Sequence, residues 1–425
     1  MRRRFLVVAG IVILLAGAAG AYLLTKDRFG RDVLGSSSGF VSTQTVRPPS
    51  TGRGLVSPMF GGVPQRLHVG VGHVRPPFRL AWTSNRTSLV EFAPALAFHS
   101  LYYATLSGDL IAVSTRTGRR LWTVHVGRCE AAEPAVNTFG GGTVFETFLN
   151  RQPSCRAGVK DPADGLLLTI AAGRTHAVRW KRNLGASETS PLIVGERLYI
   201  GTAQGNVYCL RADDGKTLWR YHVGAPVKGA IAYDRGKVFF GAYDGHVYAL
   251  GAGGGKLVWR ASSASDWTGG HGRFYSTPAV AYSRVYLGST DGKVYAFDER
   301  TGKLAWAHGT GGYVYGSPAV YGGRVFIGSY SHVFYALDAV TGRAVWTFRA
   351  DGPISGSATV VDGLVYLASL GSPGARRTYA LDARTGKKIW SWHDGGFGSV
   401  VTDGAKLYLV GGGKIYAFSP HRRHR

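Results

Sequence analysis

The sequence predicts an all-β protein, an eight-bladed β-propeller of four-stranded antiparallel blades, from three observations. A similar segment returns along the chain and closes each time on tryptophan, as in "GSTDGKVYAFDERTGKLAW" at 288–306. Glycine is abundant, with 62 residues in 425, whereas charged residues make up only 18%, which suits a β-rich fold with many tight turns. The two ends of the repeat region are complementary fragments of one unit. A period of roughly 40 to 45 residues with four short strands is typical of a propeller blade.

The first 25 residues differ from the rest of the chain. "MRRR" is followed by an uncharged apolar run from Phe5 to Leu24, which as a helix would span roughly 30 Å, the thickness of a bilayer core. We expect residues 1–25 to be an uncleaved signal anchor and transmembrane helix, with the propeller on the extracytoplasmic side. Cleavage as a signal peptide after the small residues "AGAAGA" is the alternative. Residues 26–57, rich in Ser, Gly, Pro and Arg, are expected to be a flexible linker.

The repeats are expected to occupy residues 58–420, followed by a basic tail at 421–425. In the unit at 277–306, "TPAVA", "RVYLGS", "KVYAFD" and "KLAW" are four short strand-like runs separated by turn residues. The closing tryptophan is expected to pack on the neighbouring blade. It recurs at Trp82, Trp122, Trp180, Trp219, Trp259, Trp306, Trp346 and Trp390. Aspartates before the last turn are expected to accept bonds from its backbone, at Asp298, Asp338 and Asp382.

The ends of the repeat region predict how the ring closes. The last unit has three strand-like runs and reaches Pro420 without a tryptophan strand, while the first tryptophan strand, at 78–84, has no three strands before it. Pairing of 78–84 with 414–418 would complete the eighth blade and leave no open sheet edge. We therefore expect residues before 78 to be dispensable for the closed ring.

The repeats resemble the pyrroloquinoline-quinone (PQQ)-type propeller family, whose pattern is A-x-D-x-x-T-G-x-x-x-W. The match is best at "AFDERTGKLAW", "ALDAVTGRAVW" and "ALDARTGKKIW", and nearly fails at "TIAAGRTHAVRW" in the second unit. The architecture is similar to the BamB-type assembly-factor propeller. The resemblance covers 78–420 and implies a fold that carries many functions. Quinoprotein dehydrogenases of this family have adjacent cysteines below the cofactor, a pair that this chain lacks, so we expect no cofactor.

The connections between blades, and those between the second and third strands, should open on one face around the channel. The copies differ most there, and the longest connection is "RASSASDWTGGHGRFYSTP" at 260–278. Aromatic and charged loop residues on this face predict a partner-binding surface, although they could instead plug the channel mouth. The candidates are Lys228, Trp267, His271, Arg273, Tyr275, Tyr313, Tyr315 and Phe397, with Glu188 at a matching position. Cys129 and Cys155 lie in loops of the same face and predict a disulfide in an oxidising compartment; two free thiols are the alternative.

Charge and motifs restrict the function. The formal net charge of +25 indicates general solubility or attraction to a polyanion such as anionic lipid or wall polymer, and no Lys/Arg run marks a nucleic-acid site. Catalytic, haem and metal motifs are missing. We expect a monomeric, non-catalytic, membrane-anchored scaffold that binds other envelope or membrane proteins. A sensor for an envelope glycan or wall polymer is the alternative, and a quinone-dependent dehydrogenase is the third candidate.

Overall fold

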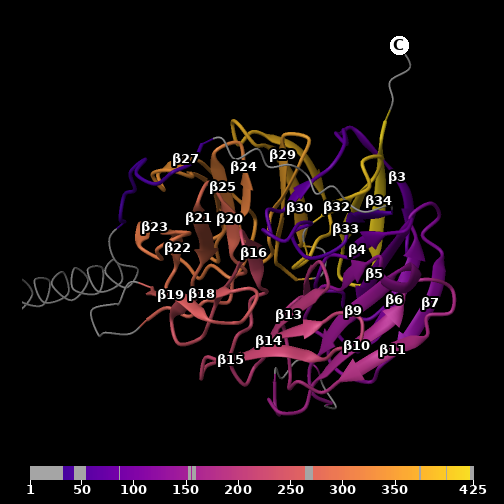
Figure 1. The fold of residues 1–425 in the computed structure, drawn as a ribbon. Coiled ribbons are helices and arrows are strands. Elements are labelled where there is room, and N and C mark those ends of the chain that lie inside the picture. The colour runs from indigo at the N-terminus through magenta and orange to yellow at the C-terminus, as the bar shows by residue number, and fades with distance from the viewer. Residues whose placement is uncertain are drawn as a thin grey trace, which may run out of the picture.

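A computed structural model describes residues 32–42, 54–85, 87–151, 155, 159–263, 271–372, 375–398 and 400–421. These residues form eight sheets that follow one another around a central channel (Figure 1). The inner strands of several neighbouring blades contact each other directly. The predicted anchor at 1–25 lies outside the described residues, and no helix within them is long and apolar enough to cross a membrane.

Each blade runs from an inner strand to an outer strand. Blades 1 and 2 consist of β4 (Ala95–Ala97), β5 (Ser100–Ala104), β6 (Asp109–Ser114), β7 (Arg120–His125), β8 (Ala135–Asn137), β9 (Thr143–Phe148), β10 (Leu166–Ala171) and β11 (Val178–Arg182), with a 3-10 turn at Phe139–Gly141. Blades 3 and 4 consist of β12 (Leu192–Val194), β13 (Arg197–Gly201), β14 (Asn206–Arg211), β15 (Thr217–His222), β16 (Ala232–Asp234), β17 (Lys237–Gly241), β18 (His246–Gly251) and β19 (Leu257–Ser262). Blades 5 and 6 consist of β20 (Ala279–Ala281), β21 (Arg284–Gly288), β22 (Lys293–Asp298), β23 (Leu304–Gly309), β24 (Ala319–Tyr321), β25 (Arg324–Gly328), β26 (Val333–Asp338) and β27 (Ala344–Arg349). Blade 7 consists of β28 (Thr359–Val361), β29 (Leu364–Ser369), β30 (Arg377–Asp382) and β31 (Lys388–Trp392).

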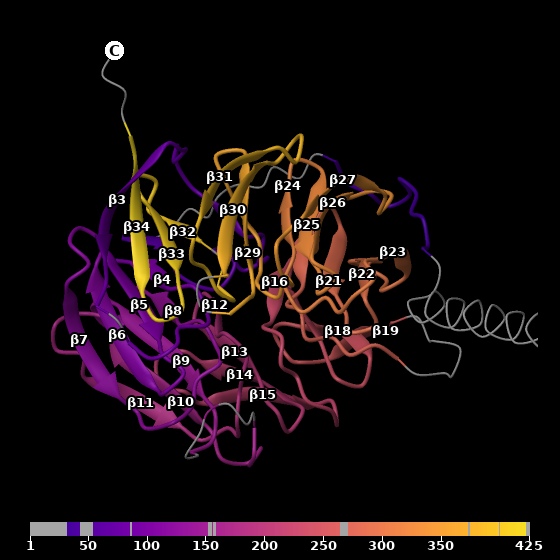
Figure 2. The ribbon, with the colours of Figure 1, turned by 180° about the vertical axis from the view of Figure 1, so that it is seen from behind.

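The eighth blade joins the two ends of the repeat region, which confirms the predicted closure. Its strands are β32 (Val401–Thr402), β33 (Leu407–Val410), β34 (Ile415–Pro420) and β3 (Phe78–Thr83). β3 pairs antiparallel with β34, from Phe78 opposite Pro420 to Thr83 opposite Tyr416. Figures 1 and 2 show β3 alongside β34 from opposite sides.

The tryptophan of each repeat forms a joint with the next blade. The Trp306 indole is fully buried and donates to the Ala339 carbonyl at 3.0 Å. Gly342 lies against the same indole, where a Cβ atom would come within 2.7 Å of the ring, and its φ of +76° also favours glycine. This explains why T-G precedes the tryptophan in the repeat. The same bond and glycine recur at six joints, made by Trp82, Trp180, Trp219, Trp259, Trp306 and Trp346.

Two joints depart from this pattern. The Trp122 indole stacks on His176 at 5.8 Å, and its Nε1 has no hydrogen-bond partner among the described residues. In blade 2 the position four residues before the tryptophan holds His176, whereas blades 1 and 3–7 have glycine there. Trp390 packs instead on Phe78 and Phe418 of blade 8, with ring centroids at 5.2 and 5.4 Å.

The turn aspartates bind as predicted. Asp298 Oδ1 accepts the backbone N–H of Thr301 at 2.8 Å and its hydroxyl at 2.7 Å. Equivalent pairs of bonds join Thr341 to Asp338 and Thr385 to Asp382. The aspartate therefore fixes the last turn of its blade, as expected from a side chain that caps backbone donors.

A segment before the first tryptophan strand lines the channel and differs from the expectation for residues before 78. It begins with β1 (Leu55–Ser57), which pairs with β4, and contains β2 (Val69–Gly70), which pairs with β28. Its carbonyls also accept hydrogen bonds from five backbone N–H groups, one on the inner strand of each of blades 2, 4, 5, 6 and 7. The Arg66 guanidinium donates to the carbonyls of Ser190 and Pro191 in blade 3, and a bridge joins Gly72 to Gly404 in blade 8. This channel segment, residues 54–74, thus contacts all eight blades.

A second part of the expected linker also packs on the propeller. Residues 32–42 lie beside β23 at the outer edge of blades 5 and 6, as the indigo segment near β23 and β27 shows in both views (Figures 1 and 2). Val33 exchanges two backbone bonds with Ala307, at 2.8 and 2.9 Å, and Phe40 stacks on Tyr282 at 5.2 Å. Apolar and backbone contacts therefore hold residues that the composition predicts to be flexible.

Candidate functional site

A pocket of about 300 Å³ opens at the channel mouth, on the face of the loops that connect blades. The same loop position, four residues before each inner strand, supplies much of its wall. From blade 1 to blade 8 this position holds Glu91, Ala131, Glu188, Lys228, Tyr275, Tyr315, Ser355 and Phe397, and all but Ala131 line the pocket. Phe60 of the channel segment also lines it, so this segment closes the inner end of the pocket.

A belt of hydroxyl groups holds the wall in place one step deeper. Thr277 Oγ1 accepts the N–H of Ala230 at 2.8 Å, Ser317 Oγ that of Thr277 at 3.0 Å, and Ser357 Oγ that of Ser317 at 3.0 Å. Each hydroxyl therefore ties its own blade to the preceding blade. A rigid scaffold of this kind keeps side chains in the geometry that recognition requires.

The wall formed by blades 5, 6 and 8 is aromatic. Tyr315 makes edge-to-face contacts with Tyr275 and Tyr330, with ring centroids at 5.5 and 5.1 Å. Tyr313 lies at the rim, with 44% of its surface exposed and its ring 5.9 Å from that of Tyr315. Burial, and then the Glu188 carboxylate, raises the pKa of the Tyr275 hydroxyl well above its usual value. Tyr275 therefore remains protonated and donates to Glu188 Oε2 at 3.2 Å.

The wall formed by blades 1, 3 and 4 is charged. Lys228 Nζ lies 2.7 Å from Glu188 Oε1 and 5.3 Å from the centroid of the Tyr243 ring. The Arg273 guanidinium lies 5.6 Å from the same ring. Burial, followed by the Glu188 carboxylate, raises the pKa of Glu91, while Arg376 lowers it. This wall thus holds two carboxyl groups and one lysine that is already paired.

The structure brings together half of the predicted site residues. Lys228, Tyr275, Tyr315 and Phe397 line the pocket, and Tyr313 and Arg273 flank it. A hollow remains between the aromatic side chains, so they do not fill the channel mouth. His271 lies apart from the pocket lining, with its ring 6.0 Å from His246 and its Nδ1 3.2 Å from the Ser263 carbonyl. Trp267 lies outside the described residues.

Sequence reasoning missed other residues that line the pocket. Glu91 occupies the same position before β4 that Lys228 occupies before β16, so an alignment of the inner strands could have found it. Tyr243 and Tyr330 follow the second strand in "GAYDG" and "GSYSH", which also share one register. Phe60 carried no signal, because it belongs to no repeat.

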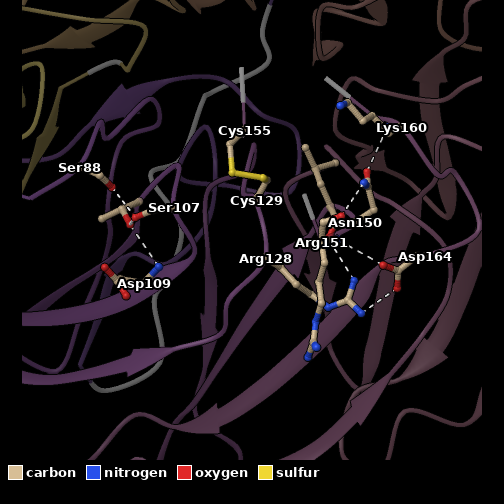
Figure 3. The surroundings of a disulfide bond; sticks show 12 residues. Ser88, Ser107, Asp109, Arg128, Cys129, Asn150, Arg151, Cys155, Lys160 and Asp164 are labelled. Carbon is tan, nitrogen blue, oxygen red and sulfur yellow. Dashed lines mark hydrogen bonds and ion pairs between the residues drawn. A yellow bond between two sulfur atoms is a disulfide. The ribbon is translucent and has the colours of Figure 1, made fainter. Parts of the chain in front are cut away.

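A disulfide connects two irregular loops of blade 2 (Figure 3). Cys129 and Cys155 are bonded, with their Cα atoms 5.3 Å apart. Beside the bond, Arg128 donates to Asp164 at 2.7 Å, and the backbone N–H of Lys160 donates to Asn150 Oδ1 at 3.2 Å. The third cysteine, Cys209, is free and buried in β14. The insertion in blade 2 is therefore fastened to the connection between blades 1 and 2.

Comparison with known proteins defines the family. The family model described as "Outer membrane protein assembly factor BamB" matches residues 106–312 and 291–422. The chain belongs to this family. No curated protein matches the sequence significantly.

Solved structures share the fold of this BamB-family chain. BamB from Moraxella catarrhalis superposes with a TM-score of 0.64 at 19% identity, covering 80% of this chain and 99% of that one. A europium-containing methanol dehydrogenase gives 0.71 at 13% identity, covering 86% and 98%. The computationally designed Ika8 protein gives 0.65 at 16% identity, covering 80% and 99%. At these identities the likeness concerns the fold, which scaffolds and enzymes share.

The pocket residues do not fit the quinone of the dehydrogenase branch. Pyrroloquinoline quinone is a tricarboxylic acid, whereas the described lining of the pocket presents Glu91, Glu188 and one lysine, Lys228, which Glu188 already neutralises. Two of the three cysteines form the disulfide and the third lies alone in β14. Within the described ranges, no group of three or more His, Cys, Asp or Glu side chains could hold a metal ion.

Proposed function

We propose that this BamB-family propeller is a non-catalytic interaction scaffold, anchored in a membrane and exposed on its extracytoplasmic side, that binds other envelope or membrane proteins. The observation that carries the proposal is the pocket face. The eight equivalent loop positions of this face hold mostly different side chains, whereas the tryptophan joints between the blades mostly share one arrangement. Variation on a constant frame is typical of a recognition surface, and exposed tyrosine and arginine at its rim are typical of interface anchors.

The position of the N-terminal segment supports partners that are themselves close to the membrane. Asp32 accepts the backbone N–H of Gly309 at 2.7 Å, at the end of β23, which leads into the loops of the pocket face. Eight residue steps separate Leu24, the end of the apolar run, from Asp32, and they can span at most roughly 29 Å. An anchor at 5–24 would therefore keep the pocket face near the bilayer.

The chemistry of the pocket supports a role without catalysis. Among the described residues that line it there is no histidine, and its serines and threonines are not paired with a base. The hydroxyls of Thr277, Ser317 and Ser357 accept backbone bonds that connect blades. Activation of a nucleophile requires an adjacent base, so these hydroxyl groups serve the frame.

Glycan recognition is the second candidate, favoured by one observation. Ser355, Ser357 and Thr277 place hydroxyl groups beside tyrosine rings in the same pocket. Such a combination could bind the hydroxyl groups and apolar faces of a sugar ring.

The scaffold is tested by exchanging one rim tyrosine. The full chain is purified from membranes after cross-linking in cells, and co-purified envelope proteins are quantified. Tyr313→Ser should reduce their recovery by roughly tenfold or more, because truncation of a hot-spot tyrosine typically costs about 2 kcal/mol or more. Tyr321→Ser is the matched control, because Tyr321 is 39% exposed at the other end of an inner strand. Equal recovery with the two variants would overturn the assignment of this face.

The anchor is tested by fractionation. The full chain should sediment with membranes and be digested by protease added to intact cells or spheroplasts, whereas a chain that starts at Asp32 should not sediment. Recovery of the full chain in the soluble fraction would contradict the anchor without affecting the assignment of the pocket face.

A further inference from the structure

Five of the seven glutamates of this basic protein lie around the channel. The chain has a formal net charge of +25 and only seven glutamates. Glu91 and Glu188 line the pocket, and three more glutamates are buried near it in blades 1 and 2: Glu130, Glu133 and Glu146. The cations near these five acids are Arg66 close to Glu133, Lys228 paired with Glu188, Arg376 acting on Glu91 from a distance, and Arg273 at the pocket rim. The channel region therefore carries more acidic than basic groups inside a strongly basic molecule.

Glu91 is the acid of the pocket without a close partner. Its carboxylate makes no hydrogen bond or ion pair within the described part of the chain, and Arg376 acts on it only from beyond ion-pair distance. Glu188, by contrast, binds both Lys228 and Tyr275. A carboxylate that faces a pocket unpaired is stabilised by any cation that enters.

Aromatic side chains complete the surroundings of that carboxylate. Phe397 precedes Gly398, which is packed tightly on the backbone of residues 91–93, so Phe397 and Glu91 come from adjoining loops. Tyr275, Tyr315 and Tyr330 form the rest of this side of the pocket through edge-to-face contacts. Aromatic faces attract cations, and the attraction increases when the site excludes water.

The neighbouring part of the pocket shows that this chemistry holds an ammonium group. Lys228 Nζ lies between the Glu188 carboxylate and the Tyr243 ring, at 2.7 Å and 5.3 Å respectively. Glu91 with Tyr315, Tyr330 and Phe397 provides the same kinds of group, and among the described residues no lysine or arginine lies within ion-pair distance of the Glu91 carboxylate. The volume of about 300 Å³ is at the lower limit for ligand pockets, which suits one side chain better than a large cofactor.

We propose that the pocket receives an organic cation, the guanidinium or ammonium head of an arginine or lysine side chain of a partner, between Glu91 and the faces of Tyr315, Tyr330 and Phe397. This inference rests on the proposed scaffold function, because it specifies the chemistry of the partner. A partner whose basic side chain enters the pocket would be recognised by charge despite the positive charge of the propeller as a whole.

The test uses the purified full chain and two probes that differ mainly in charge. N-acetyl-arginine amide carries the guanidinium, and N-acetyl-citrulline amide has a neutral urea of nearly the same shape. Titration calorimetry with tyrosine fluorescence should show saturable binding of the arginine amide, about tenfold or more tighter than that of the citrulline amide. Added salt should weaken the arginine amide selectively.

Variants localise the binding. Glu91→Gln should weaken the arginine amide about tenfold, and Tyr315→Leu should weaken it as well, with the melting temperature recorded for each variant. Glu196→Gln is the matched control, because Glu196 is exposed in the turn between β12 and β13, remote from the pocket loops. Equal binding of the two amides, or undiminished binding by a folded Glu91→Gln variant, would overturn the proposal. Binding of N-acetylglucosamine in preference to the arginine amide would overturn it in favour of a glycan.

A third probe distinguishes a partner side chain from a free organic cation as the ligand. The scaffold function is tested separately. A short peptide with a central arginine should bind more tightly than methylguanidinium if a partner side chain is the ligand, whereas equal or weaker binding would indicate a free organic cation. Binding of the arginine amide without recovery of any cross-linked partner would contradict the scaffold and leave the pocket assignment standing. If Tyr313→Ser abolishes recovery of the partners but the arginine amide does not bind, the scaffold stands and the assignment of a cation to the pocket is contradicted.

Discussion

The outer rim and the channel of this propeller use equivalent positions in opposite ways. At the rim, six of eight joints repeat one arrangement, an indole against a glycine and a carbonyl of the next blade. At the channel mouth, eight equivalent loop positions hold acids, a lysine, a serine, an alanine and aromatic residues. The ring tolerates this variety because its closure depends on the rim and on the channel segment. Residues that repeat from blade to blade therefore belong to the structural frame, and equivalent positions whose residues differ belong to the candidate site.

The largest expected effect tests the channel segment, which separates the two regions. A chain that starts at Gly54 keeps this segment, and a chain that starts at Phe78 loses it. The shorter chain should lose at least about 5 kcal/mol of unfolding free energy, because it lacks bonds to eight blades and buried Met59, Phe60, Val63 and Leu67. Urea denaturation of both chains measures the difference. Equal unfolding free energies of the two chains would show that the channel segment does not stabilise the ring.

The next effect compares a regular joint with an irregular one. Trp306→Ala should cost about 3–5 kcal/mol, as for a fully buried aromatic residue. Trp306→Phe also removes the bond to Ala339, whereas Trp122→Phe removes an indole N–H that has no hydrogen-bond partner in the described part of the chain. The phenylalanine substitution should therefore cost about 1 kcal/mol more at Trp306 than at Trp122. Equal costs in chemical denaturation would argue that the indole hydrogen bond adds nothing to the joint.

The smallest effect concerns the acids of the channel region. Burial raises the pKa of Glu146 well above its usual value, and the Glu130 carboxyl raises it further. The folded state therefore retains a proton that the unfolded state releases above about pH 4.5, so stability from this group falls as pH rises towards the folded-state pKa. Glu146→Gln lacks this loss, and its stability relative to the wild type should increase with pH by about 1 kcal/mol or more.

Denaturation midpoints at several pH values check this sign. Glu196→Gln serves as the control, because its side chain is exposed in a turn. The difference between each variant and the wild type removes contributions that both share, including that of His68, whose pKa burial lowers to about 3. A difference for Glu146→Gln that stays constant with pH would show that Glu146 is ionised in the folded protein.

At the rim, the turn bonds of the aspartates and the packing of the tryptophans on the next blade could be predicted from the sequence, whereas the indole hydrogen bond and the two irregular joints could not, and the channel could be predicted only in part. Tryptophan, T-G and aspartate recur because each repeat meets the same neighbour, so their roles follow from one unit. The pairing of β3 with β34 followed from counting strands at both ends. Prediction of the pocket wall required an alignment of the inner strands in the sequence. In that alignment Glu91, Lys228 and Tyr275 occupy the same position, four residues before the inner strand.

The channel segment could not be predicted, for a physical reason. Residues 54–74 are rich in glycine and proline and show no strand periodicity, because their backbone bonds go to inner strands of many blades instead of one partner strand. The amino-acid composition of residues 54–74 resembles that of a linker. Arg66 shows the same limit, since the carbonyls that accept its hydrogen bonds come from Phe60, Ile231, Ser190 and Pro191.

The pairing of β3 with β34 also has a consequence for biosynthesis. β3 emerges from the ribosome before any complete blade, and β34 emerges after all the others, so the ring cannot close until translation of the repeat region has ended. Until then β3 remains an edge without its partner, and a prematurely terminated chain would keep that edge exposed. Such a chain is distinguishable from the finished one by an unpaired strand at its beginning, a mark on which quality control in the cell can act.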